Sequence, residues 1–203
     1  MNLNVAEWTE KKIKIVETTI ERVAAEGFEN VTTAKIARKA RVGEGTIYRH
    51  FKSKDELTDV AAEYAATGIT KNIMKNYSPE LPAKKQFMTF CHDFLGSAQD
   101  NQSSHEYLFQ YLKSPQGLAY RKAQFGEIDK DPALARPLLY PMNLILLRAQ
   151  EELLVKDMPL QVLALLTISS LFFVVSDAAA GLLKLDQKLI NSITVACWDT
   201  VRK

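Results

Sequence analysis

The 203-residue sequence predicts an all-α protein of about nine helices. Apolar residues recur at steps of three and four along most of the chain, which is the spacing of one helix face. No segment between turn signals alternates polar and apolar residues over the length of a strand. Gly27, Pro115 and Pro159 lie between periodic segments, where they end or separate helices.

Four helices are expected in the N-terminal third of the chain. The first runs from about Thr9 to Glu26, with the Thr9 hydroxyl capping its start and Gly27 ending it. The second and third are short and lie within residues 32–51. The fourth begins after Ser53, which has a glutamate three residues later and so predicts a capping box.

The remainder of the chain predicts a second, larger helical domain. Prolines separate its helices, which are expected at about 82–101, 103–113, 116–128, 136–156, 160–184 and 186–202. Ser78, Pro79 and Pro82 mark the joint that precedes them. We therefore expect a helix-turn-helix domain over 1–54 and a ligand-binding and dimerisation domain over 55–203, with the helix 54–76 connecting them.

Basic residues are concentrated in one short stretch of an otherwise near-neutral chain. The net charge is +2, but the 23 residues from Thr32 to Lys54 contain seven basic residues against one acid, Glu44. This stretch carries +6 and leaves about −4 for the remainder. Such a local patch is typical of a DNA-binding face, although a solvated helix surface gives the same pattern. The small net charge argues against a protein that coats nucleic acid indiscriminately.

Cysteine and histidine usage argues against a disulfide scaffold, a metal site and an enzyme. Cys91 and Cys197 lie far apart without zinc-ligand spacing, and they fit a reducing interior. The N-terminus has no apolar stretch of the kind found in signal peptides, so a cytoplasmic protein is expected. The three histidines belong to no catalytic motif. We expect no catalytic residues, no metal and no cofactor.

One segment, Leu160 to Leu183, is apolar enough to require comparison with a membrane span. It contains three serines, a threonine, a glutamine and an aspartate. A spanning helix needs ~20 predominantly apolar residues with few or no charges. We interpret the segment as a helix buried on most sides, partly by a partner surface, and expect no membrane association.

Residues 32–51 have the pattern of a helix-turn-helix. Two helices of about two turns each meet at a turn around Val42 and Gly43, and Ala37 is small enough to let them approach. The second helix, EGTIYRHF, is expected in the DNA major groove, where its N-terminal end reaches the base edges. Gly45 leaves no side chain between the backbone and the DNA.

The stretch from Ile13 to about Tyr64 resembles the DNA-binding domain of the tetracycline-repressor (TetR) family, with IERVAAEGFENVTTAKIARKARVGEGTIYRHFKSKDEL at its centre. The resemblance covers about a quarter of the chain. It implies an all-helical homodimer that binds a palindromic double-stranded DNA operator and holds a small-molecule pocket in its C-terminal domain. It also implies that Thr33, Thr46, Tyr48, His50 and Lys54 mainly contact phosphates, while residues 43 to 46 (Gly43, Glu44, Gly45, Thr46), with Arg49, lie at the bases.

Two positions depart from the family pattern. Arg41 stands where the family often has glycine, so either the turn is strained or the side chain adds a phosphate contact. Glu44 stands where a basic or small residue is common. It either stabilises the helix N-terminus through the dipole, typically by about 0.3–1 kcal/mol, or accepts a hydrogen bond from a cytosine amino group.

The C-terminal two-thirds is rich in aromatic side chains, most of which are expected to be core. Such a domain can still enclose an apolar cavity with a few polar groups. The ligand-binding candidates are Phe90, Phe94, Tyr107, Tyr111, Arg148, Phe173 and Asp177. Polar residues expected to face inward are His92, His105, Arg148, Glu151 and Asp177. His92 neighbours Cys91, but adjacent helical residues diverge by ~100° and do not readily chelate a metal together.

The helices at about 160–184 and 186–202 are the candidates for a homodimer interface. A stripe at three-to-four-residue spacing combines apolar and small residues, and consists of Leu163, Leu166, Ser170, Val174, Asp177 and Gly181. Burial within one subunit is the alternative, but it leaves the opposite apolar face of the helix uncovered.

Two functions remain open at this level. The first is a DNA-binding transcriptional regulator, a repressor that releases its operator on binding a small, largely apolar molecule. The second is an effector-independent, DNA-bound structural or division-control protein on the same scaffold. The sequence does not indicate the effector, the operator or the regulated genes.

Overall fold

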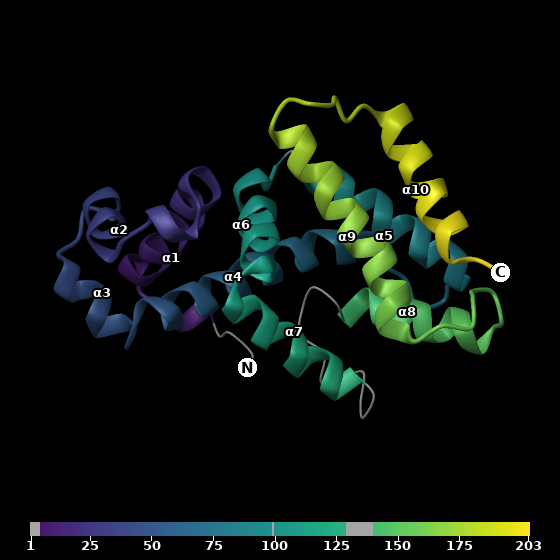
Figure 1. Ribbon diagram of the computed structural model, residues 1–203, viewed down its shortest axis with the longest axis horizontal. Coiled ribbons are helices and arrows are strands. Elements are labelled where there is room, and N and C mark those ends of the chain that lie inside the picture. The colour runs from purple at the N-terminus through teal and green to yellow at the C-terminus, as the bar shows by residue number, and fades with distance from the viewer. Residues whose placement is uncertain (1–4, 99, 129–139) are drawn as a thin grey trace.

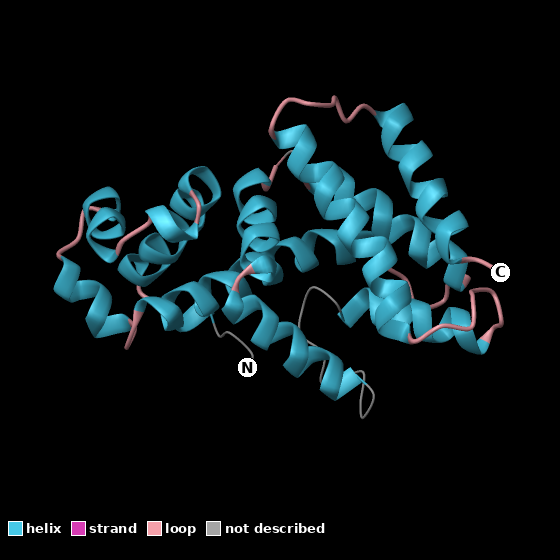
Figure 2. Ribbon diagram, in the orientation of Figure 1, coloured by secondary structure: helices cyan, strands magenta, loops and turns pink. Residues whose placement is uncertain are grey.

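The computed structural model describes residues 5–98, 100–128 and 140–203, which contain ten α-helices (Figures 1 and 2). The molecule is elongated, with the first three helices at one end, the fourth leading away from them and the six C-terminal helices towards the other end. The helices are α1 (Glu10–Glu26), α2 (Thr33–Ala40), α3 (Glu44–His50), α4 (Lys54–Ile73), α5 (Ala83–Ser97), α6 (Gln102–Lys113), α7 (Pro115–Ile128), α8 (Tyr140–Glu151), α9 (Leu160–Ala179) and α10 (Gln187–Val201).

Side-chain caps begin the N-terminal helices where the sequence predicts them. The Thr9 hydroxyl accepts a hydrogen bond from the backbone of Lys12, 3.2 Å away, and starts α1. The Thr32 hydroxyl accepts from the backbone N–H of Lys35 and caps α2. Ser53 caps α4 as predicted. In a capping box the Glu56 carboxylate would accept from the backbone N–H of Ser53, but here it accepts from that of Lys52, the residue before the cap.

Several expected helix ends are wrong because the chain turns earlier. The helix expected over 136–156 ends at Glu151, since Leu153 adopts a left-handed conformation with φ of 58°. The segment after it forms an isolated antiparallel bridge between Val155 and Arg202. The helix expected over 160–184 ends at Ala179, followed by Gly181 with φ of 76°. Residues 136–139 of the first expectation lie outside the described residues.

The small N-terminal core holds the helix-turn-helix together. Ile36 and Ala37 of α2 and Ile47 of α3 are buried against the inner face of α1, and Phe51 closes the end of α3. Burial of each large apolar side chain stabilises this domain by about 1.5–3 kcal/mol. The same apolar spacing that predicted these helices therefore fixes how they pack.

Helix α6 ties the C-terminal part to the DNA-binding part. The Tyr107 hydroxyl donates a hydrogen bond to the backbone oxygen of Thr58 in α4, at 2.7 Å. The Tyr107 ring lies 5.4 Å from the ring of Phe28, in the loop between α1 and α2. One turn later, the Tyr111 hydroxyl donates to the Asp59 carboxylate at 2.7 Å. A shift of α6 would therefore displace the segments that support α2 and α3.

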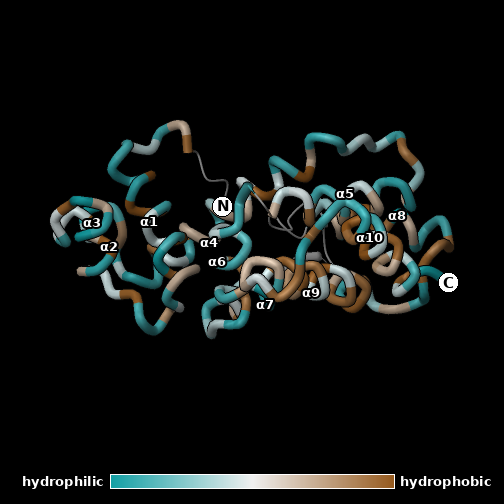
Figure 3. Tube along the Cα trace, turned by 90° about the horizontal axis from the view of Figure 1, so that it is seen from above, coloured by the Kyte–Doolittle hydropathy of each residue, from teal (hydrophilic) through white to brown (hydrophobic). Residues whose placement is uncertain are grey.

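Helix α9 is buried on one face only. It packs against α5, α6, α8 and α10, yet by length and composition it is also apolar enough to span a membrane. Figure 3, which views the molecule from above, shows α9 coloured as hydrophobic along much of its length. Its exposed face carries Val162, Leu165, Leu166 and Phe173. A single chain therefore leaves a broad apolar surface of this helix uncovered, and the expected burial of that surface by a partner stays a prediction.

Candidate functional site

The turn between α2 and α3 is built around Arg41. This residue adopts the left-handed conformation, with φ of 58° and ψ of 44°, and ends α2. An L-residue there costs about 1–2 kcal/mol relative to glycine. Gly43, by contrast, has φ of −70° and caps α3, so its backbone does not require glycine. Strain in the turn, one of the two alternatives raised by Arg41, is therefore present, and it lies at Arg41 and not in the Val42-Gly43 pair.

The face of α3 expected to read DNA is open to solvent. Glu44, Gly45, Tyr48 and Arg49 are exposed, whereas Thr46 and His50 are half-buried. A Cβ built on Gly45 would meet nothing within 4 Å, so the protein's own packing does not explain the glycine. Close approach of DNA remains a sufficient reason for it.

Polar side chains join the first turns of α2 and α3. The Thr33 hydroxyl donates to the Glu44 carboxylate at 2.5 Å and lies 3.3 Å from the Tyr48 hydroxyl. These three residues therefore form one cluster on the exposed face. Arg49 is also held locally, since its Nε donates to the backbone oxygen of Gly45 at 3.4 Å.

Lys54 lies at the edge of this surface and is only half-exposed. Its ammonium donates a hydrogen bond to the backbone oxygen of Phe28 at 3.1 Å. Because an ammonium has three donors, this bond leaves Lys54 able to face a phosphate as well. The contact also links the start of α4 to the loop that Tyr107 touches.

The cationic surface of the helix-turn-helix extends onto α1, and this extension was not predicted from the sequence. Two residues of α1, Lys14 and Arg22, join Arg38, Lys39 and Arg41 around a shallow hollow of about 460 Å³. No acidic side chain lines it within the described residues. Lys14 and Arg22 are eight residues apart, so they share a face of α1, and this spacing was the available signal.

The seven ligand-binding candidates do not gather around one cavity. Phe90 and Phe94 are buried and stack on each other, with ring centroids 6.3 Å apart. Arg148 donates to the backbone oxygen of Pro79 at 2.6 Å and pairs with Glu152. Tyr107 and Tyr111 bond to α4, as described above, and Phe173 and Asp177 lie on the exposed face of α9.

Of the polar residues expected to face inward, the structure buries His105. Its Nε2 lies 3.1 Å from the Ser97 hydroxyl, while its Nδ1 has no partner among the described residues. Burial lowers the pKa of His105 to about 4, so the ring is neutral at pH 7. His92 is half-buried beside Asp93, and Glu151 and Asp177 are exposed, so the expectation is wrong for the two carboxylates.

Cys91 and Cys197 are brought together, although the sequence separates them widely. Both thiols are free and buried, on the facing helices α5 and α10. Burial raises the pKa of the Cys91 thiol well above its usual value, and a hydrogen bond links it to Cys197. Among the described residues no group of three or more potential ligands is arranged for a metal ion.

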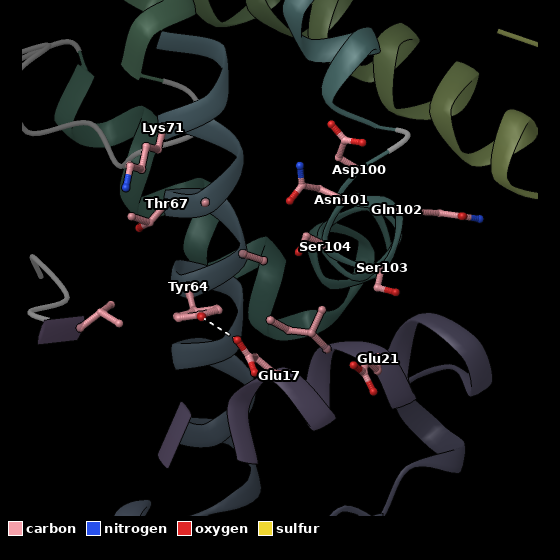
Figure 4. A pocket seen from close by; sticks show the side chains of 14 residues that line it. Glu17, Glu21, Tyr64, Thr67, Lys71, Asp100, Asn101, Gln102, Ser103 and Ser104 are labelled. Atoms are coloured by element: carbon pink, nitrogen blue, oxygen red, sulfur yellow. Dashed lines mark hydrogen bonds between the residues drawn. The ribbon is translucent and has the colours of Figure 1, made fainter. Parts of the chain in front are cut away.

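A polar cleft of about 620 Å³ lies where α1, α4 and the start of α6 meet (Figure 4). Glu17 and Glu21 line it from α1, and Asp100 and the first residues of α6 line the other side. The Tyr64 hydroxyl crosses from α4 to the Glu17 carboxylate, a bond of 2.9 Å. Desolvation, with that carboxylate, raises the pKa of Tyr64 to about 12 and keeps it a donor. The cleft leaves unfilled space between the two parts of the molecule.

Comparison with known families decides what this arrangement belongs to. Residues 15–61 match the model of bacterial regulatory proteins of the tetR family, and residues 82–202 match a tetracyclin repressor-like C-terminal domain. The chain belongs to the TetR family. Its likeness to this family therefore extends beyond the helix-turn-helix to the C-terminal helices, which carried no comparable sequence signal.

Individual relatives of this TetR-family chain agree with the assignment. A helix-turn-helix-type transcriptional regulator of Haemophilus influenzae is 25% identical over 190 residues, covering 94% of this chain and 95% of its own. A TetR-family structure from a Shewanella species has a TM-score of 0.78 at 19% identity, covering 96% of this chain and all of its own. A nucleoid occlusion factor of Alteromonas mediterranea is 27% identical over 93 residues, 46% of this chain and 48% of its own.

Membership in the TetR family fixes the general activity of the protein. It is a helix-turn-helix transcriptional regulator and not an enzyme. The exposed face of α3 is accordingly its candidate DNA-reading surface, and α2 with the first turn of α4 supports that surface.

Proposed function

We propose that the protein is a homodimeric repressor that releases a palindromic operator when it binds a small, largely apolar molecule. The observation that carries this proposal is the placement of two surfaces at different ends of the molecule. The basic helix-turn-helix occupies one end, and the exposed apolar face of α9 lies on the six-helix part at the other (Figures 1 and 3).

The face of α9 supports a dimer through α9 and α10. Val162, Leu165, Leu166 and Phe173 are exposed on α9, and Val195 is exposed on α10. Of the expected interface stripe, Leu166, Ser170 and Asp177 are exposed, but Leu163 is buried within the chain and Gly181 lies beyond the helix. An apolar surface of this kind on a soluble regulator usually meets a second copy.

Substitution of the exposed face tests the dimer. Leu166→Glu and Val195→Glu should convert the dimer to monomer in light scattering, because each places a charge in an apolar interface. Met158→Glu is the matched control, since Met158 is an exposed apolar residue outside both helices. Dimers that persist in both variants would contradict the proposed interface.

A dimer explains how a ligand would control DNA binding. Two recognition helices fit adjacent major grooves only when they lie about one DNA turn apart, ~34–36 Å. A ligand that binds one spacing better than the other shifts the population towards it. The polar cleft beside α1 supports such movement, because its walls come from both parts of the molecule.

An effector-independent role in organising DNA is the second candidate function. The likeness to a nucleoid occlusion factor over 93 residues favours it. The two candidates differ in one measurable respect, which is whether a bound small molecule changes DNA affinity.

The deciding experiment begins with genomic DNA fragments recovered on the purified protein, which yield the operator and the neighbouring genes. Candidate effectors suggested by those genes are then titrated into the protein–operator complex in a gel shift. Release at effector concentrations that saturate the protein supports the repressor. Effectors that bind without changing DNA affinity would support the second candidate.

A further inference from the structure

A small apolar pocket lies between α6, α7 and α9. Its volume is about 170 Å³. Six apolar side chains line it, namely Phe109, Leu112, Leu165, Ile168, Phe172 and Phe173. Of these residues, only Phe173 was a ligand-binding candidate from the sequence. The pocket shares no lining residue with the polar cleft beside α1.

Aromatic rings give this pocket its shape. Phe109 meets Phe173 edge to face, with centroids 4.7 Å apart, and lies parallel to Phe172 at 6.2 Å. An engineered cavity of ~150 Å³ with a similar apolar lining in another protein binds benzene. The pocket therefore suits one aromatic ring or a short aliphatic chain, and it is too small for a long chain.

Two cations stand at the edge of the apolar lining. Lys113 and Arg121 both line the pocket, and no acidic side chain does so within the described residues. The Lys113 ammonium lies 3.4 Å from the centroid of the Phe109 ring and 5.1 Å from that of Phe173. A cation held against aromatic faces remains free to pair with an anion beside it.

One donor of the Arg121 guanidinium has no partner among the described residues. This donor is the Nε, which is buried. A buried donor of a charged group without a partner is costly, by about 1–3 kcal/mol or more. A planar carboxylate matches the guanidinium fork and would satisfy this donor.

We propose that this pocket binds a small organic acid whose apolar body has the size of one ring. The body lies among the phenylalanines, and the carboxylate pairs with Arg121 and Lys113. This inference rests on the proposed ligand response and names the chemistry of the effector. The rival occupant is an apolar side chain of the second copy, since Leu165 and Phe173 belong to the exposed face of α9.

Helix α6 connects the pocket to the DNA-binding part. Phe109, Leu112 and Lys113 line the pocket, while Tyr107 and Tyr111 bond to α4. Phe109 is two residues from each tyrosine, about 200° around the helix, and so on the opposite face. An acid that displaces α6 moves the helix whose other face holds Phe28 and the start of α4.

The test uses the full-length wild-type protein with compounds matched in shape. Benzoate and hexanoate should bind in calorimetry and raise the melting temperature, and the two together distinguish an aromatic from an aliphatic body. Benzyl alcohol, benzylamine and hexylamine should bind at least tenfold more weakly, because they lack the carboxylate. Equal binding of the alcohol, or binding of neither acid, would overturn the proposal.

Variants then locate the binding site. Arg121→Gln and Lys113→Gln should each weaken binding of the preferred acid at least tenfold, while Lys122→Gln, an exposed neighbour on α7, should not. Leu112→Trp should abolish binding by filling the pocket. Unchanged binding in all three pocket variants would exclude this site, and the wild-type comparison stands even if one variant fails to fold.

DNA release separates this inference from the function on which it rests. An acid that binds in an Arg121-dependent manner should also weaken operator binding. If the acid binds there but leaves DNA affinity unchanged, the ligand-responsive function is wrong while the site stands. If an unrelated compound releases the DNA and the acids do not bind, the site is wrong while the function stands.

Discussion

Thr33 donates a hydrogen bond of 2.5 Å to Glu44 across the helix-turn-helix. The two residues begin α2 and α3, so this bond holds together the two helix ends that are expected to face the DNA. The acid that seemed out of place on a basic surface therefore has a partner inside the protein. Its position in the first turn of α3 also favours a negative charge through the helix dipole.

Glu44→Gln should strengthen DNA binding without changing which sequences are preferred. Glutamine keeps an acceptor for Thr33 and removes a charge that phosphates repel, so we expect affinity to rise roughly two- to fivefold at low salt. Anisotropy titrations with the operator and a scrambled duplex measure both quantities. Thr33→Val is the control, since it breaks the bond and keeps the charge. A changed base preference in the glutamine variant would mean that Glu44 reads a base.

Gly45→Ala should leave the fold intact and weaken DNA binding. The added Cβ meets no protein atom within 4 Å, and alanine stabilises a helix by up to about 1 kcal/mol relative to glycine. On the DNA side the methyl group occupies space that the backbone of α3 needs, so affinity should fall at least tenfold. Gly96→Ala, equally open but on α5, should change neither property. Wild-type DNA affinity in the Gly45 variant would show that the backbone does not approach the DNA closely.

Arg41→Gly and Arg41→Ala remove the same positive charge but should differ in the free energy of unfolding. Both remove the guanidinium, but only glycine relieves the left-handed conformation, so the glycine variant should be more stable than the alanine variant by about 1 kcal/mol. Urea denaturation measures this difference. If Arg41 also contacts a phosphate, the plot of log affinity against log salt flattens by about 0.9 in both variants. Equal stability would contradict the strain inferred from φ.

His105 should make the protein less stable in mild acid. Its pKa is about 4 when folded and 6.5 when unfolded, so the unfolded chain takes up a proton that the folded chain excludes. The contribution of the neutral His105 ring to the free energy of unfolding is complete above pH 6.5. It is lost as the pH falls towards 4, by about 3 kcal/mol in total. His105→Gln should lower stability at pH 7 yet reduce this pH dependence in parallel denaturation curves. An identical pH dependence in the variant would contradict burial of a neutral ring.

The N-terminal part of the fold could be predicted because its information is local. Thr9 and Ser53 cap the helices they were expected to cap, and Ile36 and Ile47 are buried as their spacing indicates. The ends at Leu153 and Gly181 depend on where a distant segment pairs with the chain, or on a turn that follows without a proline. Apolar periodicity carries neither kind of information, so the predicted helices extend beyond the ends that the structure shows.

The candidate sites divide in the same way. Residues of α3 follow one another in sequence, so a motif identifies them together. The apolar pocket draws Phe109 from α6, Arg121 from α7 and Ile168 from α9, and no spacing links three helices that meet only after folding. Tyr107 and Tyr111 looked like ligand contacts because aromatic content does not distinguish a side chain that lines a cavity from one that joins two helices.

The contacts of α6 have a consequence for how the molecule unfolds. Tyr107 is fully buried between Thr58 and Phe28, and so belongs to the cores of both parts of the chain. When one side chain completes two cores, loss of either core removes support from the other, and the parts unfold together. We therefore expect a single calorimetric transition with equal van't Hoff and calorimetric enthalpies. The joint between the parts is thus a shared interior and not a flexible tether.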